Sequence, residues 1–265
     1  MTGLKVDDVE IVLNKTVILN NISFEIPSQS ILAIIGPNGS GKTTLGKALS
    51  AQIKIQKGII RWNEVELHNQ PISAVSKTVG YLFQNPNIGL FEKSVEKEIL
   101  LGQHLEKNEM NEILKEFHLL KLRKRNPRLL SRGQKQLLSL AVTLSRKTPL
   151  VIADEIFSGL DNSFKEIIWN RILHRISFQT FIIITHNLNF VLEHATHVLG
   201  LFDKNLEFFG TPKELITSDF FKRINYPIPL SYYLLEEFKK ENKIPDNISN
   251  LSFLKEYFKI ESNRV

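Results

Sequence analysis

Apolar residues fall in short continuous runs along most of the chain, and segments with the helical period follow these runs. The clearest runs are ILAII at residues 31–35, LVIA at 150–153 and FIII at 181–184. All three have the length of a strand. Strands that alternate with helices in this way indicate a mostly parallel sheet with helices on its faces, so we predict the α/β fold class.

Two regions depart from this alternation. Residues 9–13 and 18–26 form strand patterns separated by turn residues, so the chain opens with a β-rich part. From about residue 94 to residue 145 the pattern is mostly helical, which predicts a helical insert within the α/β frame. We therefore predict one main domain over residues 1–212 with a helical subdomain inside it.

The chain changes character after Gly210. Pro227 and Pro229 interrupt regular structure, and apolar residues then recur at helical spacing in two groups. These groups are Leu230, Leu234 and Phe238, followed by Leu254, Tyr257 and Phe258. We predict a small C-terminal helical extension over residues 213–265. It either folds back on its own domain or forms a subunit contact.

Composition limits where the chain works and what it binds. The 265 residues, 42% of them hydrophobic, suffice for a sizeable core. No apolar run approaches the roughly 18 residues of a membrane span, and no secretory signal is readable, so we predict a cytoplasmic location. The absence of Cys excludes disulfides and thiolate metal sites. The net charge of +6 permits an anionic ligand, a membrane face or nucleic acid. We interpret the densest basic run, Lys121–Arg128, as a solvated loop, because no aromatic residue interrupts it.

The sequence GPNGSGKTT matches the phosphate-loop pattern in full and lies between a predicted strand and a predicted helix. In such a loop, backbone N–H groups converge on phosphate oxygens at a helix N-terminus. Lys42 is expected to reach the terminal phosphates, and the Thr43 hydroxyl to bind Mg²⁺. The motif predicts a nucleoside triphosphate with Mg²⁺ as the ligand. Its residues are Gly36, Pro37, Asn38, Gly39, Ser40, Gly41, Lys42, Thr43 and Thr44.

Polar side chains also follow other predicted strands. Asp154 ends the strand LVIA, where its carboxylate would lie beside the phosphate loop as a Mg²⁺ ligand, and Glu155 comes next. Two adjacent carboxylates can divide the work, with the first near the metal and the second activating the attacking water. His186 and Gln84 each follow a strand too. We expect His186 at the terminal phosphate or the water, and Gln84 at Mg²⁺ or the water.

In this order, the stretches GPNGSGKTT, YLFQNPN, LSRGQKQ, LVIADEIFSGLD and IIITH resemble the ATP-binding subunits of ATP-binding cassette (ABC) transporters. The resemblance covers residues 1–212. It implies a phosphate-loop fold with a parallel sheet, an antiparallel β subdomain and a helical subdomain. It also implies that two such domains pair head to tail with ATP and Mg²⁺ between them, on the cytoplasmic face of the membrane. No nucleic-acid partner is expected.

The resemblance assigns roles to matching residues. Ser131, Gly133 and Gln134 would contact ATP on the second ATPase subunit, and residues 158–161 would form a loop that crosses the dimer. Glu155 would be the general base, and His186 would contact the terminal phosphate. Gln84 would link the Mg²⁺ site to the integral membrane subunits.

A looser resemblance points to the energy-coupling-factor importers, which take up vitamins or cobalt and nickel. It rests on NPNIGLFEKSVEKEILLGQ and on the segment that begins GTPKELITSDFF. In that group the C-terminal part helps the two ATPases to pair.

The chain differs from the ABC pattern at three places. Arg132 replaces a Gly, Ile156 replaces a Pro, and the early strand has no aromatic residue to stack on adenine, so Leu13 or a neighbour would supply only apolar contact. None of these changes removes a catalytic group, and we expect hydrolysis. Two other functions stay open: a soluble ABC ATPase acting on nucleic acid or ribosomes, and a regulatory subunit that binds nucleotide without hydrolysing it.

Overall fold

The computed structural model describes residues 3–224 and residue 241. The two apolar groups predicted for the C-terminal extension, Leu230 to Phe238 and Leu254 to Phe258, lie outside the described residues. The strands are β1 (Gly3–Leu13), β2 (Thr16–Pro27), β3 (Ile31–Ile35), β4 (Lys57–Trp62), β5 (Val65–Glu66), β6 (Val79–Leu82), β7 (Leu150–Asp154), β8 (Thr180–Ile184), β9 (His197–Phe202) and β10 (Asn205–Gly210). The α-helices are α1 (Lys42–Leu49), α2 (Ile72–Val75), α3 (Val95–Leu100), α4 (Lys107–Glu116), α5 (Arg132–Ser145), α6 (Asn162–Leu173), α7 (Leu188–His194), α8 (Pro212–Thr217) and α9 (Phe220–Arg223). Short 3₁₀ helices are η1 (Pro86–Gly89), η2 (Leu120–Leu122) and η3 (Pro127–Leu129).

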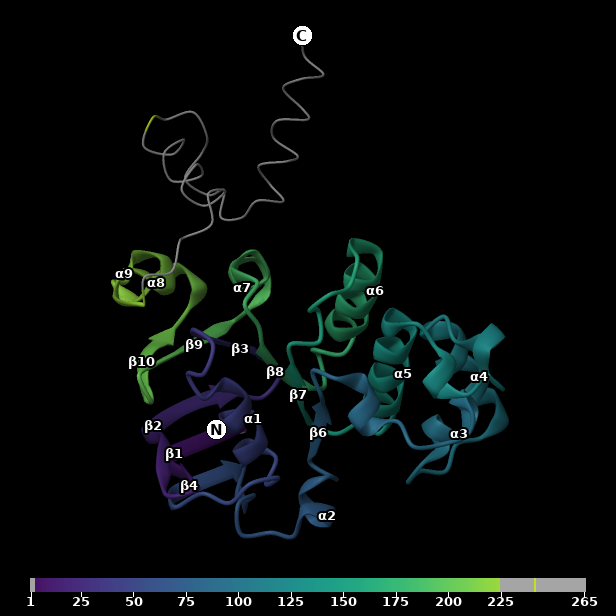
Figure 1. Cartoon of the computed structure of the whole chain (residues 1–265), viewed down its shortest axis with the longest axis horizontal. Helices are drawn as coiled ribbons and strands as arrows, with labels where there is room; N and C mark the ends of the chain where they lie inside the picture. Colours follow the sequence, from purple (N-terminus) through teal and green to yellow (C-terminus); the bar gives the residue numbers. More distant parts are fainter. Residues whose placement is uncertain (1–2, 225–240, 242–265) are drawn as a thin grey trace.

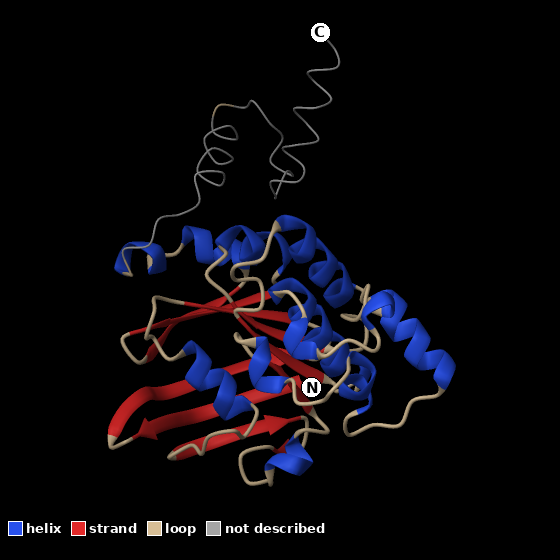
Figure 2. Ribbon diagram, turned by 45° about the vertical axis from the view of Figure 1, so that its right-hand side comes forward, coloured by secondary structure: helices blue, strands red, loops and turns tan. Residues whose placement is uncertain are grey.

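The strands form two sheets. The larger sheet has six strands in the order β10-β9-β3-β8-β7-β6, and the smaller has four in the order β2-β1-β4-β5. In the larger sheet β9, β3, β8, β7 and β6 run parallel, and β10 is antiparallel to β9. The smaller sheet is antiparallel throughout. Figure 2 shows the parallel sheet with helices above it and the antiparallel sheet below. The predicted α/β class and the β-rich opening are confirmed.

Strand β3 explains how the two layers pack. Ile31, Ala33 and Ile35 face one hydrophobic cluster, which contains residues of α5, α6 and α7. Leu32 and Ile34 face a second cluster, built with α1 and the antiparallel sheet. Since successive side chains of a strand point to opposite faces, a strand buried on both faces needs apolar residues throughout. The continuous run ILAII meets this need.

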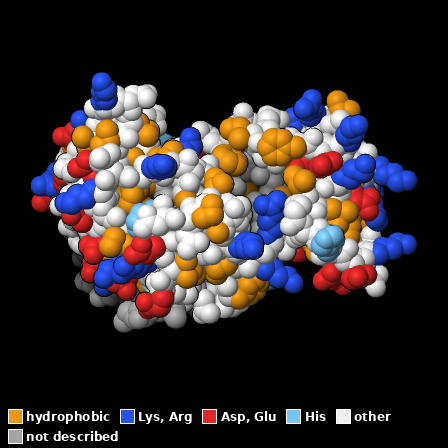
Figure 3. All heavy atoms as spheres, turned by 90° about the horizontal axis from the view of Figure 1, so that it is seen from below, with side chains coloured by type: hydrophobic (Ala, Val, Ile, Leu, Met, Phe, Trp, Pro, Cys, Tyr) orange, Lys and Arg blue, Asp and Glu red, His pale blue; other side chains and the backbone are white. Residues whose placement is uncertain are grey.

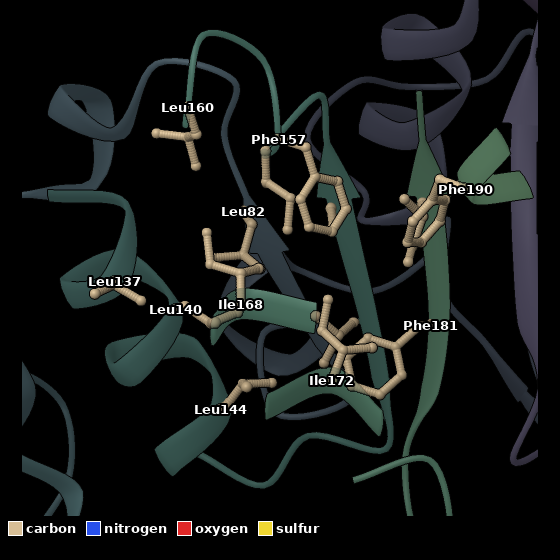
Figure 4. Close-up of a cluster of buried hydrophobic side chains, with 14 of the residues drawn as sticks. Leu82, Leu137, Leu140, Leu144, Phe157, Leu160, Ile168, Ile172, Phe181 and Phe190 are labelled. Atoms are coloured by element: carbon tan, nitrogen blue, oxygen red, sulfur yellow. The ribbon is translucent and has the colours of Figure 1, made fainter. Parts of the chain in front are cut away.

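The first cluster also joins the helical segment and the helices α8 and α9 to the sheet. Figure 4 shows part of it, with Leu137, Leu140 and Leu144 of α5 facing Leu82 and the α6 residues. Leu215 of α8 and Phe220 and Phe221 of α9 are buried in the same cluster. The first residues after Gly210 therefore pack on the parallel sheet as part of the main core.

The structure places all the predicted site strands at one edge. Because β3, β8, β7 and β6 are parallel neighbours, their carboxyl ends meet at the same edge of the sheet. The phosphate loop follows β3, Asp154 ends β7, His186 follows β8 and Gln84 follows β6. This edge is the usual ligand site of a parallel sheet.

Local backbone and side-chain features set the bounds of two elements. β4 and β5 form a hairpin, and Asn63 in its turn takes a left-handed conformation, with a φ of 53°. α6 begins at Asn162 because the Asp161 side chain caps it. None of the helices in the described part of the chain is long and apolar enough to span a bilayer.

Candidate functional site: a phosphate loop beside paired carboxylates

The loop between β3 and α1 depends on glycine. The φ angles of Gly36 and Gly41 are 147° and 95°, values that residues with a side chain rarely adopt. A side chain at Gly36 would begin 2.2 Å from the Leu201 carbonyl oxygen, and one at Gly41 would begin 2.7 Å from the Leu19 side chain. The loop therefore closes tightly at the N-terminus of α1, where free N–H groups and the helix dipole favour a phosphate.

Lys42 begins α1 and points back into this loop. Its side chain is buried, and Nζ donates hydrogen bonds to the carbonyl oxygens of Gly36 at 2.9 Å and Pro37 at 2.8 Å. Burial lowers the Lys42 pKa, while the nearby Glu155 and Asp154 act in the opposite direction. Because both of its acceptors are neutral, an anionic phosphate oxygen would be a stronger partner for this ammonium group.

Asp154 lies beside the phosphate loop with both carboxylate oxygens engaged. It is 3% exposed, and Oδ1 accepts a hydrogen bond from Thr43 Oγ1 at 3.2 Å. The Tyr81 hydroxyl donates to Oδ2 at 3.1 Å. Burial, and then the charge of Asp154, raise the pKa of Tyr81 well above its usual value, so the phenol remains a donor. Tyr81 therefore holds the orientation of the carboxylate from within the sheet.

Glu155 lies one residue beyond the strand in a left-handed conformation, with a φ of 50°. Its N–H donates to the Ile184 carbonyl oxygen at 3.0 Å, which ties this turn to β8. Burial raises the pKa of Glu155 to about 7, Lys42 opposes the shift and Asp154 adds to it. A carboxylate with a pKa near neutral is suited to accept a proton at neutral pH.

His186 faces the same carboxylate. Its Nε2 lies 3.2 Å from Oε1 of Glu155. Burial, with the charge of Lys42 as a second cause, lowers the pKa of His186. The imidazole is therefore mainly neutral at neutral pH and can exchange hydrogen bonds with a carboxylate, a water or a phosphate.

A cavity of about 320 Å³ joins these groups. The structure thus brings together the phosphate loop, Gln84, Glu155 and His186, as predicted, while Asp154 lies beside Thr43. The cavity is lined by Ile18, Asn38, Gly39, Gly41, Lys42, Thr43, Thr44, Gln84, Glu155, Ile184 and His186.

The donor set fits a Mg²⁺ ion bound together with a nucleotide. Thr43 Oγ1 and the Asp154 carboxylate are hard oxygen donors 3.2 Å apart, and Gln84 adds an amide on the cavity wall. No group of three or more His, Cys, Asp or Glu side chains in residues 3–224 and 241 is placed to hold a metal. Mg²⁺ is commonly held by one or two carboxylates together with substrate phosphates, which is the arrangement these residues could offer.

Ser131, Gly133 and Gln134 lie elsewhere. They form the N-terminus of α5, where Ser131 and Gln134 cap each other's backbone N–H groups at 3.3 and 3.0 Å. None of the three lines the cavity, and α5 lies on the far side of β6 from α1 (Figure 1). The chain therefore has two candidate surfaces, a cavity beside its phosphate loop and an exposed N-terminus of α5, and Gln84 lies between them.

The departures from the family pattern leave the cavity intact. The Arg132 guanidinium donates to the Ser158 carbonyl oxygen at 2.9 Å, and Ile156 is buried in the main core. Leu13, which was considered for apolar contact with the adenine ring, is 37% exposed and does not line the cavity. Ile18 does line it. No aromatic residue in the described part of the chain lines the cavity. Apolar contact with the nucleobase would therefore come from Ile18.

The basic run is partly engaged within the helical segment. Arg123 forms an ion pair with Glu96 and donates to Asn111 Oδ1 at 2.8 Å. On the face shown in Figure 3, Lys and Arg side chains lie among Asp and Glu side chains at both ends of the molecule.

Sequence reasoning missed Tyr81 and Ile18. Tyr81 pairs with Ile152 in the β6–β7 register, so it shares a sheet face with Asp154, two residues further along β7. The pairing of β6 with β7 was the missing signal, because Tyr81 does not stand out within its own segment. Ile18 would have needed the position of β2 relative to the phosphate loop.

Comparisons with known proteins agree with this geometry. The sequence profile of the ABC transporter family matches residues 19–158. The energy-coupling factor transporter ATP-binding protein EcfA2 of Caldanaerobacter subterraneus is 30% identical, over 96% of each chain. EcfA of Methanococcus maripaludis is 31% identical, over 86% of each chain.

A solved structure shows the same fold. It is a dimeric ATP-binding cassette in a post-hydrolysis state bound to ADP and Pi, with a TM-score of 0.70 and 21% identity. The match covers 79% of this chain and 98% of that one.

Proposed function

Because the chain belongs to the ABC transporter family and is an ATP-binding, ATP-hydrolysing subunit, we propose that it energises an importer of the energy-coupling-factor type. The cargo would be a vitamin or a transition-metal ion, carried by integral membrane subunits. One observation carries the catalytic part of the proposal: the phosphate loop, Gln84, Glu155 and His186 line a single cavity.

The proposed chemistry assigns each group a role. Lys42 and the loop N–H groups bind the terminal phosphates, and Thr43, Asp154 and Gln84 hold Mg²⁺. When bound, the ion would neutralise phosphate charge. Glu155 accepts a proton from the attacking water, and His186 hydrogen-bonds to the terminal phosphate. Tyr81 and Thr43 hold the Asp154 carboxylate in place.

The proposal requires a second ATPase subunit, either another copy or a different chain. Ser131 is exposed at the N-terminus of α5, outside its own cavity, where N–H groups and the helix dipole would favour the phosphates of a partner's ATP. The loop at 158–161 would lie across the same interface. Sequence similarity to EcfA2 along 96% of both chains supports the importer assignment.

The test is to tag this chain, extract it from native membranes in mild detergent and identify every chain that remains bound. The proposal expects integral membrane proteins and an ATPase subunit. It expects no binding of the purified complex to nucleic acid at physiological salt. Salt-dependent nucleic-acid binding with only soluble partners would contradict it and favour the soluble ATPase.

A further inference from the structure

Arg132 contacts the loop that follows the catalytic turn of the same chain. Its Nη2 donates to the Ser158 carbonyl oxygen at 2.9 Å. The next residue, Gly159, has a φ of 69°, and a side chain there would begin 3.0 Å from Nη1 and 3.1 Å from Cζ of Arg132. The guanidinium therefore lies against a bare glycine, and its position depends on the absence of a side chain.

A second contact joins the same two segments a few residues further on. Gly133 is buried, and a side chain there would begin 2.8 Å from the Phe164 ring on α6. Asp161 caps α6 by accepting a hydrogen bond from the Phe164 N–H at 3.0 Å. The loop at 158–161 is thus held at its start by Arg132 and at its end by the packing of Phe164 on α5.

We infer that Arg132 is a positioning residue that clamps the loop at 158–161 to the N-terminus of α5. The inference rests on the proposed function in one respect, because both segments are assigned to the interface with the second ATPase. A clamp between them makes the segment that meets the partner's nucleotide and the loop that crosses the dimer move together. With a Gly at position 132, the hydrogen bond to the Ser158 carbonyl oxygen would be lost, while the Phe164 contact would remain.

The geometry favours a clamp over direct binding of the partner's nucleotide. The guanidinium already donates to a backbone carbonyl within its own chain and packs on Gly159. A planar guanidinium can donate and stack at once, whereas a Lys ammonium group can only donate. The clamp therefore predicts that Arg132→Lys keeps only part of the attachment between the loop at 158–161 and α5.

Amide hydrogen exchange on the isolated chain tests the clamp without relying on ATPase activity. In Arg132→Ala, peptides covering residues 156–162 should exchange about two- to tenfold faster than in the wild type, the range expected for loss of one net hydrogen bond. In Arg132→Lys, the exchange rate of these peptides should lie between those of the wild type and Arg132→Ala. The matched control is Arg146→Ala at the other end of α5, because Arg146 Nη2 donates to the Leu101 carbonyl oxygen at 3.1 Å. Arg146→Ala should leave residues 156–162 unchanged, and equal exchange in Arg132→Ala and the wild type would overturn the clamp.

Steady-state kinetics of the assembled ATPase pair test how the clamp affects ATP turnover. A clamp predicts that Arg132→Ala lowers kcat with less than about a twofold change in the KM for ATP, because the residue does not bind nucleotide. A raised KM with unchanged kcat would indicate direct phosphate binding and would overturn the inference. Gly159→Ala should be non-additive with Arg132→Ala if both act on one contact. If the wild-type pair showed no turnover, the proposed function would fail while the exchange experiment still decided the clamp.

Discussion

The cavity beside the phosphate loop and the N-terminus of α5 differ in how complete they are within one chain. In the cavity, charged groups are partly or fully buried, and burial shifts the pKa values of Lys42, Glu155 and His186. At α5, Ser131 and Arg132 are exposed and bond mainly to backbone groups of their own chain. The comparison teaches that a single chain positions its catalytic side chains and sets their pKa values by burying them. The N-terminus of α5, by contrast, offers exposed hydrogen-bond donors that need the nucleotide of a partner subunit.

The largest expected effect is on Glu155. Replacing it with Gln keeps the shape but removes the base, so phosphate release should fall by about 10² to 10⁴-fold. ATP binding should persist, since Lys42 and the loop are unchanged. Glu166→Gln, at an exposed position of α6, is the control and should keep full activity. Undiminished turnover in Glu155→Gln, or no turnover in the wild type with its partners, would favour the regulatory-subunit function.

Ser131 tests the other side of the comparison. Asp is also a good N-cap, so Ser131→Asp should fold as stably as the wild type, whereas Ser131→Ala should lose about 1 kcal/mol of stability. In the assembled pair, however, the added carboxylate should repel the partner's phosphates and lower turnover by about 100-fold. Thermal unfolding and phosphate release measure the two effects. Full activity of Ser131→Asp would show that this N-terminus does not meet a nucleotide.

Tyr81 tests how firmly the cavity is preorganised. Tyr81→Phe removes the donor to Asp154 Oδ2 and should lower the free energy of unfolding by about 1.5 kcal/mol, the lower range for a hydrogen bond to a charged group. It should also weaken Mg²⁺-dependent ATP binding, measured by calorimetry. In an Asp154→Asn background the stability effect should shrink, because the charged acceptor is gone. Equal losses in both backgrounds would mean that the hydroxyl acts elsewhere.

The last expected effect is on the pH dependence of stability. The folded-state pKa of Glu155 is about 7, above its ordinary value of 4.5, so the folded chain holds this proton more tightly than the unfolded chain. The contribution of the protonated Glu155 carboxyl group to the free energy of unfolding is therefore fully present below pH 4.5. It is lost as the pH rises toward 7. Subtracting the unfolding free energies of Glu155→Gln from those of the nucleotide-free wild type should isolate this decline. A difference that stays constant from pH 4.5 to pH 8 would contradict the raised pKa.

Much of the fold could be predicted because each layer leaves its own pattern. The run ILAII predicted β3 because both faces of that strand are buried. β10 was not predicted, since the turn before it uses Asp203 and Lys204 in left-handed conformations rather than a glycine. That turn leaves no strong local signal. The role of Tyr81 depended on strand register, which a single sequence does not encode locally.

The sequence by itself determined the phosphate loop, the strand that ends in Asp154 and Glu155, and the order of the motifs, because glycines, charges and apolar runs act over a few residues. Only the tertiary structure decided which side chains meet. It placed Tyr81 on Asp154, His186 on Glu155 and Arg132 on the Ser158 carbonyl, through strand register and helix packing across long separations in the chain. It also gave Glu155 its raised pKa, because burial depends on every layer that surrounds the carboxylate.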